Sequence, residues 1–395
     1  MISIEKQNFK GLKAIVRVDF NIPLGPNREV LDSSRIEAAK PTVMKIINDG
    51  GSCILISHLG RPKRKEKELS LKHIIPAIEK TLSLKVQFVE DTIGERAQKA
   101  AKKLKPGEVL ALENLRFYPE ETKGDKRFAK QLASYADCYI NYAFGTAHRA
   151  HASTTTITEF FQDKKYSGLL LYNEIQAIKK VLQKGEKPVL AILGGSKVSS
   201  KITIIENIMD KVDEIIIGGG MAFTFVKALG GSIGDSIFEE EKQDLALSIM
   251  KKARKKRVKI YLPIDAVCSD ELSNTGNKKV FEIKKIPTKW QGLDAGPKSI
   301  KIFDKAIMSA KTILWNGPIG VFEIDSFSKG TMAIGNSVAK STEKGAFSLV
   351  GGGDSVAAVK KFNLQQKVSY VSTGGGAMLE SLEGRVLPGI EALSN

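Results

Sequence analysis

The chain has 395 residues, of which 42% are hydrophobic and 27% are charged, a composition that is typical of globular proteins and excludes disordered, collagen-like and coiled-coil chains. At this length we expect two or three domains. Lys and Arg outnumber Asp and Glu by 17, which suits a nucleic acid, an anionic membrane or a small acidic ligand. Because only 7% of the residues are aromatic and few of the basic residues are arginine, we favour a lysine-rich solvated surface over a nucleic-acid partner.

The cysteines and the N-terminal residues indicate the cellular compartment. Cys53, Cys138 and Cys268 form neither a zinc motif nor a disulfide framework, which favours a reducing environment. Charged residues such as Glu5 and Lys6 interrupt the N-terminal segment, so it does not resemble a secretory signal. No apolar stretch reaches about 18 residues, the length that a membrane-spanning helix needs. We therefore expect a cytoplasmic protein with no membrane partner.

Short apolar segments rich in β-branched residues recur along the chain and predict buried strands. They are AIVRVDF (14–20), SCILIS (52–57), EVLALEN (108–114), CYINYAF (138–144), VLAIL (189–193), EIII (214–217), KIYL (259–262), TILW (312–315), FSLV (347–350) and SYVS (369–372). Segments with helical spacing lie between them, at 199–210, 239–252 and 331–343. This alternation predicts an α/β fold with doubly wound parallel sheets flanked by helices.

The loops that follow the predicted strands of the first half are rich in cations and hydrogen-bond donors. They are Asp19-Phe20-Asn21, His58-Leu59-Gly60-Arg61, Asn114-Leu115-Arg116 and the basic loop at 145–151. Ligands of open α/β sheets bind at this carboxyl edge, and arginine suits phosphate and carboxylate groups. The first half is therefore expected to bind a small polyanion, although Asp19 and Asn21 could also serve only as turn formers.

The corresponding loops of the second half offer bare backbone instead. They are Gly194-Gly195, Gly218-Gly219-Gly220, Asn316-Gly317-Pro318, Gly351-Gly352-Gly353-Asp354 and Gly374-Gly375-Gly376. Glycine lets backbone N–H groups approach a ligand closely, and the N-terminus of a helix favours phosphate. The second half is therefore expected to bind a nucleotide.

The segment 168–187 separates the two halves. Its LLLYNEIQAIKKVLQK stretch has helical spacing and is followed by Gly185 and Pro188, which are stop signals for a helix. We expect a connector helix here. The basic run KKARKKR at 251–257 is interpreted as a solvated helix end rather than a nucleic-acid patch.

Several catalytic motifs are absent or out of context. The chain contains no Gly-Lys pair and no GxGxxG, which excludes a Walker A loop and the Rossmann dinucleotide fingerprint. The GxSxG match at 230–234 follows a helix-like segment, and all histidines precede it, in contrast to the order in α/β-hydrolases. His148 and His151 could form a metal pair or cap a helix, but Arg149 between them favours anion binding.

A series of motifs in this order resembles the phosphoglycerate kinase family and spans essentially the whole chain. The motifs are VRVDFNIP (16–23), SHLGRP (57–62), ENLRF (113–117), AFGTAHRAH (143–151), ILGGSKVSSKI (192–202), IIIGGGMAFTF (215–225), LWNGPIGVFE (314–323), VGGGDS (350–355) and VSTGGGA (371–377). No single motif is decisive, but their number and order make a chance match negligible.

The resemblance implies reversible phosphoryl transfer from 1,3-bisphosphoglycerate to ADP, with Mg²⁺, giving 3-phosphoglycerate and ATP. It implies a monomeric enzyme that requires no nucleic acid. It also implies two Rossmann-like domains: 1–167 would bind the triose, 188–381 the nucleotide, 168–187 would form the hinge, and 382–395 would pack back onto the first domain.

The resemblance further implies the site residues. The triose would be bound by Asp19, Phe20, Asn21, Arg35, His58, Leu59, Gly60, Arg61, Arg116 and Arg149. The nucleotide would be bound by Lys197, Lys201, Gly219, Leu293, Asn316, Glu323, Gly352, Gly353, Asp354 and Ser355, and Asp354 would hold Mg²⁺.

Phosphoryl transfer depends mainly on positioning and on stabilisation of negative charge. The expected catalytic groups are Arg35, Lys197 and Lys201, together with the backbone of Gly352 and Gly375. Lys197 and Lys201 are four residues apart, so we expect their ammonium groups on one helical face near the helix N-terminus. The acyl phosphate leaves as a weakly basic carboxylate, and no general acid is needed.

Two positions depart from the pattern of the family. Tyr142 replaces the usual Asp of Asn-Asp-Ala-Phe-Gly, and Tyr172 and Asn173 stand where a charged residue usually precedes Glu174. Because Tyr142 removes a carboxylate beside the basic loop, a catalytically degraded member of the family is one alternative to the active kinase. A nucleic-acid-binding protein, suggested by the net charge, is another.

Overall fold

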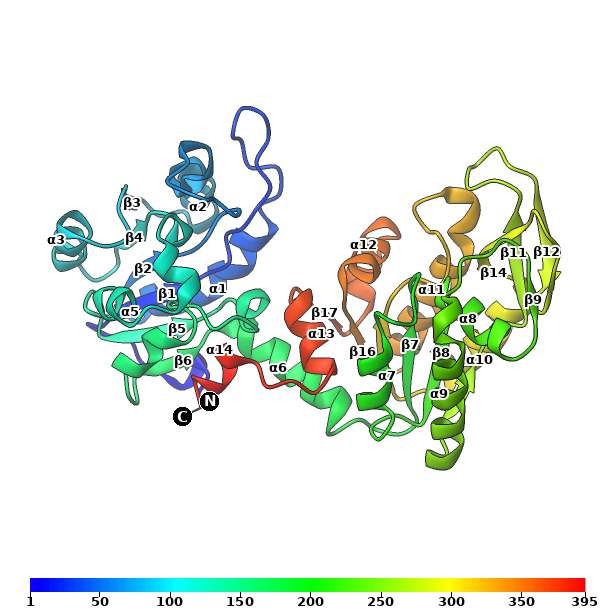
Figure 1. Ribbon diagram of the computed structural model, residues 1–395. Helices are drawn as coiled ribbons and strands as arrows, with labels where there is room; N and C mark the ends of the chain where they lie inside the picture. Colours follow the sequence, from blue (N-terminus) through cyan, green and yellow to red (C-terminus); the bar gives the residue numbers. More distant parts are fainter. Residues whose placement is uncertain (395) are drawn as a thin grey trace. The chain divides into compact units, whose positions relative to one another are not determined.

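The computed structural model describes residues 1–394, and the apolar segments of its first half form one parallel sheet (Figure 1). From edge to edge its strands are β3 (Val86–Val89), β4 (Val109–Leu112), β2 (Ser52–Ile56), β1 (Lys13–Arg17), β5 (Cys138–Asn141) and β6 (Lys165–Ser167). Every residue of β2, β4 and β5 is buried. Burial on both faces is typical of parallel sheets and explains why these strands have continuous apolar sequences.

Helices cover both faces of this first sheet. They are α1 (Ser34–Asn48), α2 (Ile75–Leu82), α3 (Glu95–Lys103), α4 (Pro119–Lys123), α5 (Lys126–Ala133) and α6 (Leu169–Leu182). Residues of α1 and α2 form one core with the strand residues Val16 and Leu55. Ile15 and Ile54 are also fully buried, and they face the opposite side because neighbouring residues in a strand alternate.

A second parallel sheet forms in the other half of the chain (Figure 1). Its order is β10 (Lys259–Tyr261), β8 (Glu214–Ile217), β7 (Val189–Leu193), β15 (Thr312–Asn316), β16 (Phe347–Val350) and β17 (Tyr370–Val371). The accompanying helices are α7 (Ile202–Ile208), α8 (Met221–Ala228), α9 (Gln243–Lys256), α10 (Pro297–Ser309), α11 (Lys329–Glu343), α12 (Gly353–Lys361) and α13 (Gly376–Leu382). Phe303 of α10 and Trp315 of β15 are fully buried in the core of this sheet.

The predicted fold class is confirmed, since each predicted strand segment overlaps an observed strand. The predicted helices also form, with shifted ends. The segment 199–210 is helical only from Ile202 to Ile208, and the helix predicted over 239–252 runs from Gln243 to Lys256.

The sequence analysis missed several short strands. A three-stranded antiparallel sheet joins β12 (Lys278–Glu282), β11 (Asp265–Ser269) and β14 (Gln291–Ala295), and a parallel pair joins β9 (Ser232–Ile233) and β13 (Lys285–Ile286). The edge strands β3 and β6 were missed as well. β12 is mostly exposed and rich in lysine, and β14 contains Gly and Asp, so their pairing comes from tertiary context rather than from local propensity.

The chain divides into two compact units. The first unit holds residues 1–175 and the C-terminal segment from Val386, and the second unit holds Gln176–Arg385. The boundary falls within α6, which lies inside the segment 168–187. The short helix α14 (Pro388–Glu391) belongs to the first unit, where Gly389 N–H donates to the carbonyl oxygen of Ala147 at 2.8 Å.

Within the part of the chain that the structure describes, no helix is both long and apolar enough to cross a membrane. Cys53, Cys138 and Cys268 are free and buried. Burial raises the pKa of Cys138 and of Cys268 to about 12, so these thiols remain protonated at neutral pH.

Phe303 provides a test of the second core. Replacing it with Ala removes a fully buried ring and should lower the free energy of unfolding by about 3–5 kcal/mol. Lys301→Ala, an exposed change on the same helix, should alter it by less than about 0.5 kcal/mol. Chemical denaturation of both variants measures the difference, and similar losses for the two would contradict the packing described for α10.

Candidate functional site

Parallel pairing brings the loops after β1, β2 and β5 to the same edge of the first sheet. Arg17, the last residue of β1, pairs with Ile56 of β2 and Asn141 of β5. The loops that carry Asp19 and His58 therefore begin side by side at the carboxyl edge, where ligands of such sheets bind.

Hydrogen bonds link half of the ten predicted triose-site residues. Arg35, from α1, forms an ion pair with Asp19 at 2.6 Å between Nη1 and Oδ2. The other oxygen of Asp19 accepts from Asn21 N–H at 3.3 Å, and Asn21 Oδ1 accepts from Gly60 N–H at 2.8 Å. Arg116 Nη1 then donates to the Gly60 carbonyl at 2.6 Å. Polar groups from three loops and one helix are thereby held in one array.

Phe20 and Leu59, which were also predicted to bind the triose, have buried side chains in the first core. Their backbone N–H groups donate to Ser57 Oγ at 2.9 Å and to Asn114 Oδ1 at 3.2 Å, respectively. These two residues fix the shape of the loops, and their side chains belong to the core.

His58 is held as a neutral imidazole. It is buried, and its Nδ1 lies 3.1 Å from Arg17 Nη2. Because arginine can only donate, Nδ1 accepts and the proton lies on Nε2. Burial, followed by the charges of Arg17, Arg116 and Arg149, lowers the pKa of His58 well below its usual range. His58 can therefore donate from Nε2 without carrying charge.

Arg17 is a site residue that the sequence analysis missed. Its side chain is fully buried, and Nε donates to Ser153 Oγ at 3.0 Å. Ser153 donates in turn from Oγ and from its backbone N–H to the two carboxylate oxygens of Glu121, at 2.6 and 3.0 Å. Burial raises the pKa of the fully buried Glu121, whereas the charge of Arg17 lowers it. The sequence feature that could have indicated Arg17 is its charge within a mostly apolar predicted strand.

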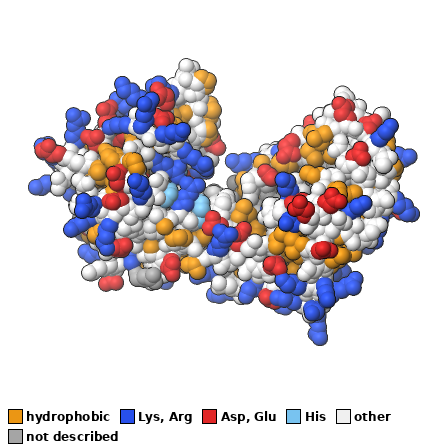
Figure 2. Space-filling model, in the orientation of Figure 1, with side chains coloured by type: hydrophobic (Ala, Val, Ile, Leu, Met, Phe, Trp, Pro, Cys, Tyr) orange, Lys and Arg blue, Asp and Glu red, His pale blue; other side chains and the backbone are white. Residues whose placement is uncertain are grey.

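A cavity of about 430 Å³ brings three predicted arginines together. Arg61, Arg116 and Arg149 line it, along with Lys63 and His151. Burial and the neighbouring arginines lower the pKa of His151 to about 4, and burial lowers that of Arg116 to about 10. Figure 2 shows blue Lys and Arg side chains around pale-blue histidines on the first unit. This concentration of positive charge is suited to an anion.

The second unit contains a separate cavity of about 410 Å³. Glycines of three loops come into close contact beside it. A Cβ on Gly194 would lie 1.9 Å from the Pro318 carbonyl oxygen, and a Cβ on Gly219 would lie 2.7 Å from the Gly195 carbonyl oxygen. Gly219 also has a φ of 68°. Only glycine permits this approach, which leaves backbone groups at the cavity wall.

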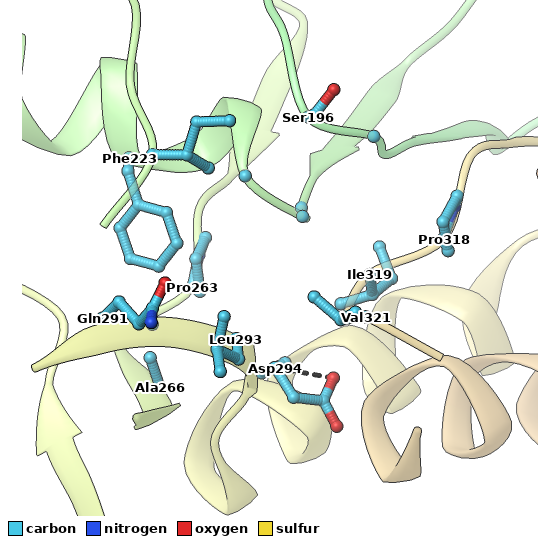
Figure 3. Close-up of a pocket in the computed structure, with 18 of the residues that line it drawn as sticks. Ser196, Phe223, Pro263, Ala266, Gln291, Leu293, Asp294, Pro318, Ile319 and Val321 are labelled. Carbon is cyan, nitrogen blue, oxygen red and sulfur yellow. Dashed lines mark hydrogen bonds between the residues drawn. The ribbon is translucent and has the colours of Figure 1, made fainter. Parts of the chain in front are cut away.

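The wall of this cavity is largely apolar (Figure 3). Leu293 was predicted here, whereas most of the other apolar lining residues were not; these include Pro263, Ala266, Leu272, Ile283, Ile319 and Val321. In Figure 3, Phe223 and Leu293 lie on one side of the cavity and Ile319 and Val321 on another. Ala266 comes from the antiparallel sheet that the sequence analysis missed, which explains why its place in this wall was not anticipated. Such walls accommodate a flat aromatic ligand.

Three residues that the sequence analysis assigned to the nucleotide site also line the cavity. They are Gly219, Glu323 and Asp354. Lys201 Nζ donates to Asn316 Oδ1, and Asn316 Nδ2 donates to the Gly351 carbonyl at 2.7 Å. Burial lowers the pKa of Lys201, and the Asp354 carboxylate raises it. Lys201 therefore lies close to both Asn316 and Asp354.

The position of Lys197 relative to helix α7 differs from the one expected from the sequence. Helix α7 begins only at Ile202, so Lys197 and Lys201 do not share a helical face. Ser200 Oγ donates to the Lys197 carbonyl at 2.8 Å, and the Ser199 N–H donates to Glu239 at 2.9 Å. These serine contacts stabilise turns in competition with helix. Lys197 is exposed, whereas Lys201 is partly buried.

The remaining predicted glycines lie at the starts of helices. Gly352 (φ 91°) precedes α12, which begins at Gly353, and Gly375 (φ 49°) precedes α13. Ser355, in the first turn of α12, accepts a hydrogen bond from Gly317 N–H through Oγ. The first turn of α12 thus presents N–H groups beside Asp354, as helix N-termini do in phosphate sites.

Asp294 is a buried lining residue that the sequence analysis missed. It accepts hydrogen bonds from Gly330 N–H at 2.7 Å and Ala295 N–H at 2.9 Å. Burial raises its pKa to about 7. A Cβ on Gly320 would lie 2.0 Å from Asp294 Oδ1, so this carboxyl fixes the loop that forms one wall. The sequence feature that could have indicated Asp294 is an aspartate flanked by apolar residues and glycines in the segment GLDAG.

Among residues 1–394, no three His, Cys, Asp or Glu side chains cluster to hold a metal ion. Asp354 alone offers a carboxylate at the start of α12, beside the cavity. One carboxylate is compatible with Mg²⁺, which takes most of its ligands from water and substrate phosphates.

Comparisons with known proteins agree over both units. A family model described as phosphoglycerate kinase matches residues 4–385. The phosphoglycerate kinase of Porphyromonas gingivalis is 51% identical over 99% of this chain and 100% of its own length, and a cytosolic one of Nicotiana tabacum is 47% identical over 100% and 98%. The solved structure of phosphoglycerate kinase from Coxiella burnetii has a TM-score of 0.93 at 41% identity and covers 100% of this chain and 98% of its own.

His151 makes the stability of the first unit depend on pH. Its pKa is lowered from 6.5 to about 4 in the folded protein, so between these values the unfolded chain binds more protons. The free energy of unfolding therefore rises with pH across this window. Because the lowered pKa of His58 contributes to the same rise, we expect His151→Gln to reduce its slope in urea denaturation without removing it, and His73→Gln, on a separate 3-10 helix, to retain the full slope. Equal slopes for the two variants would contradict the buried, uncharged state of His151.

Proposed function

Because the chain belongs to the phosphoglycerate kinase family, we propose that its two cavities bind the two reactants of that enzyme's reaction. The enzyme is a phosphotransferase of glycolysis. It transfers a phosphoryl group reversibly from 1,3-bisphosphoglycerate to ADP, giving 3-phosphoglycerate and ATP. The observation that carries the assignment is the family match over residues 4–385.

The triose phosphate is assigned to the first unit. The cavity lined by Arg61, Arg116 and Arg149 takes the phosphate, since guanidinium groups can bind it bidentately. Arg35 takes the carboxyl end, and His58 donates from Nε2. The carboxylate of Asp19 accepts from the substrate hydroxyl, with Asn21 beside it. The array of hydrogen bonds through Gly60 supports this assignment, because it keeps these groups in a fixed arrangement before binding.

The nucleotide is assigned to the second unit. Phe223, Leu293 and Val321 enclose the base, and Glu323 accepts from the ribose hydroxyls. The glycines beside the cavity and the first turn of α12 bind the phosphates through backbone N–H groups. Asp354 holds Mg²⁺ together with the nucleotide phosphates. When bound, the ion neutralises phosphate charge.

The catalytic groups are those that can stabilise charge on the transferred phosphoryl group. Lys201 lies beside Asp354 and Asn316, and its ammonium group can leave Asn316 for the phosphoryl oxygens. Arg35 stabilises the group from the triose side, and Gly352 and Gly375 contribute backbone N–H groups. Lys197, which is exposed, is assigned to binding of the nucleotide phosphates. Such positioned charges supply most of the rate acceleration in phosphoryl transfer.

The two reactants are assigned to separate units, so the units must bring them together. We assign the hinge to the segment 168–187, which contains the boundary between the units. We further propose that the protein acts as a monomer in the cytoplasm. The absence of a membrane-spanning helix among the described residues is compatible with this location.

A coupled assay with 3-phosphoglycerate, ATP and Mg²⁺ tests the function directly. We expect turnover of the order of 1–100 s⁻¹, as is typical of kinases. A folded protein with no turnover would instead support the catalytically degraded alternative raised by Tyr142. Binding of duplex DNA at physiological salt, measured in the same preparation by gel shift, is expected to be absent.

Lys201→Ala tests the proposed catalytic charge. Loss of an electrostatic group that acts in the transition state should lower kcat by about 10²–10³-fold, while KM for ATP changes much less. The control is Lys211→Ala, an exposed lysine of the same unit, which should leave both constants unchanged. An unchanged kcat in the Lys201 variant would refute its catalytic role.

A further inference from the structure

The hydroxyl group of Tyr142 is buried without a hydrogen-bond partner. Tyr142 follows β5, its side chain is 1% exposed, and its phenolic oxygen has no partner among the described residues. Most buried hydroxyls are hydrogen-bonded, and a buried donor left unpaired costs free energy. This residue also stands where the sequence departs from the family pattern, so the proposed function does not yet account for it.

Tyr142 lies next to the loop that carries Asp19. Its backbone N–H donates to the Arg17 carbonyl at 3.1 Å, which extends the pairing of β5 with β1 by one residue. Asp19 follows only two residues after Arg17. On its other side, Tyr142 contacts the start of α6: a Cβ on Gly168 would lie 3.0 Å from Tyr142 Cα and Cβ and 3.3 Å from its ring. The backbone of Tyr142 is therefore held by the segment after β1, and its ring lies against the start of α6.

The charges around the hydroxyl are those of the proposed triose site and of α6. After burial, the carboxylates of Asp19 and Glu174 raise the pKa of Tyr142, and the charge of Arg35 lowers it. The phenol therefore stays protonated over the physiological range. A protonated phenol near carboxylates can act only as their donor.

The carboxylate of Asp19 has one charged partner, Arg35, which the substrate also requires. The Asp19 side chain is 13% exposed and pairs with Arg35 at 2.6 Å, and the Arg35 side chain is 42% exposed. In the proposed function, Arg35 turns to the anionic substrate. This movement would leave the mostly buried Asp19 carboxylate without its charged donor, with only the Asn21 N–H and the substrate hydroxyl donating to it, so a further donor would stabilise its charge.

We propose that Tyr142 is a positioning residue whose hydroxyl donates to the Asp19 carboxylate when Arg35 binds the substrate. The exchange keeps Asp19 ionised and oriented towards the substrate hydroxyl. It also gives the buried hydroxyl an acceptor, which it otherwise lacks. The inference rests on the proposed triose site and adds to it a residue that does not touch the substrate.

Tyr142→Phe removes the hydroxyl and retains the ring. We expect Kd for 3-phosphoglycerate, measured by isothermal titration calorimetry, and KM for it to rise by about tenfold, the loss expected for a hydrogen bond to a charged group. KM for ATP should not change. The Tm without substrate should stay constant or rise, because an unpaired buried donor is removed; a hydroxyl with a structural role would lower Tm instead. Tyr135→Phe, at another buried tyrosine of the same unit, is the matched control and should change none of these values.

A double-mutant cycle identifies the acceptor. In an Asp19→Asn background, Tyr142→Phe should cause little further loss of affinity, whereas in a Glu174→Gln background its full effect should persist. Retention of the full effect in Asp19→Asn, or its disappearance in Glu174→Gln, would overturn the inference. If Asp19→Asn weakens binding of 3-phosphoglycerate and Tyr142→Phe does not, the inference fails and the triose site stands. If Asp19→Asn has no effect either, the assignment of the triose site itself is wrong.

Discussion

The parallel pairing of β1 with β2 and β5 is the constraint on which the first unit's site depends. The strands are buried on both faces, so they cannot carry exposed polar groups along their length, and the polar residues gather where the strands end. The register aligns Arg17 with Ile56 and Asn141. Residues more than a hundred positions apart in the sequence thus meet at one edge, and the same arrangement recurs in the second unit around β7 and β15.

The two units offer different physical means of binding an anion. In the first unit, buried or half-buried arginines concentrate charge so strongly that they help to lower the pKa of His58 and His151. The fully buried Glu121 holds Arg17 through Ser153. In the second unit, close contacts between glycines such as Gly194 and the Pro318 backbone create a cavity of backbone groups and apolar side chains. The first arrangement suits a small, highly charged reactant, and the second suits a nucleotide with an aromatic base.

Residues that do not touch the reactants have a large share in forming both sites. Asp294 fixes the second unit's loops by accepting from Gly330 and by filling the space beside Gly320. Arg17 sets the tautomer of His58. Asp294 and Arg17 thus keep functional groups in place before binding, which reduces the ordering that the reaction itself requires.

The sequence by itself determined the α/β fold class, the strands of both sheets apart from short edge strands, and the contrast between basic and glycine loops, because apolar periodicity and glycine have local physical meaning. Only the tertiary structure showed that the antiparallel sheet exists. Gly292 of β14 and the exposed Lys279 of β12 give no local indication of a strand, but both strands pair with β11. The tertiary structure likewise decided that Lys197 lies outside α7, that Arg17 reaches Ser153 and that Asp294 meets Gly330. These contacts join segments distant in sequence, and their free energy comes from burial and hydrogen bonding that no local pattern records.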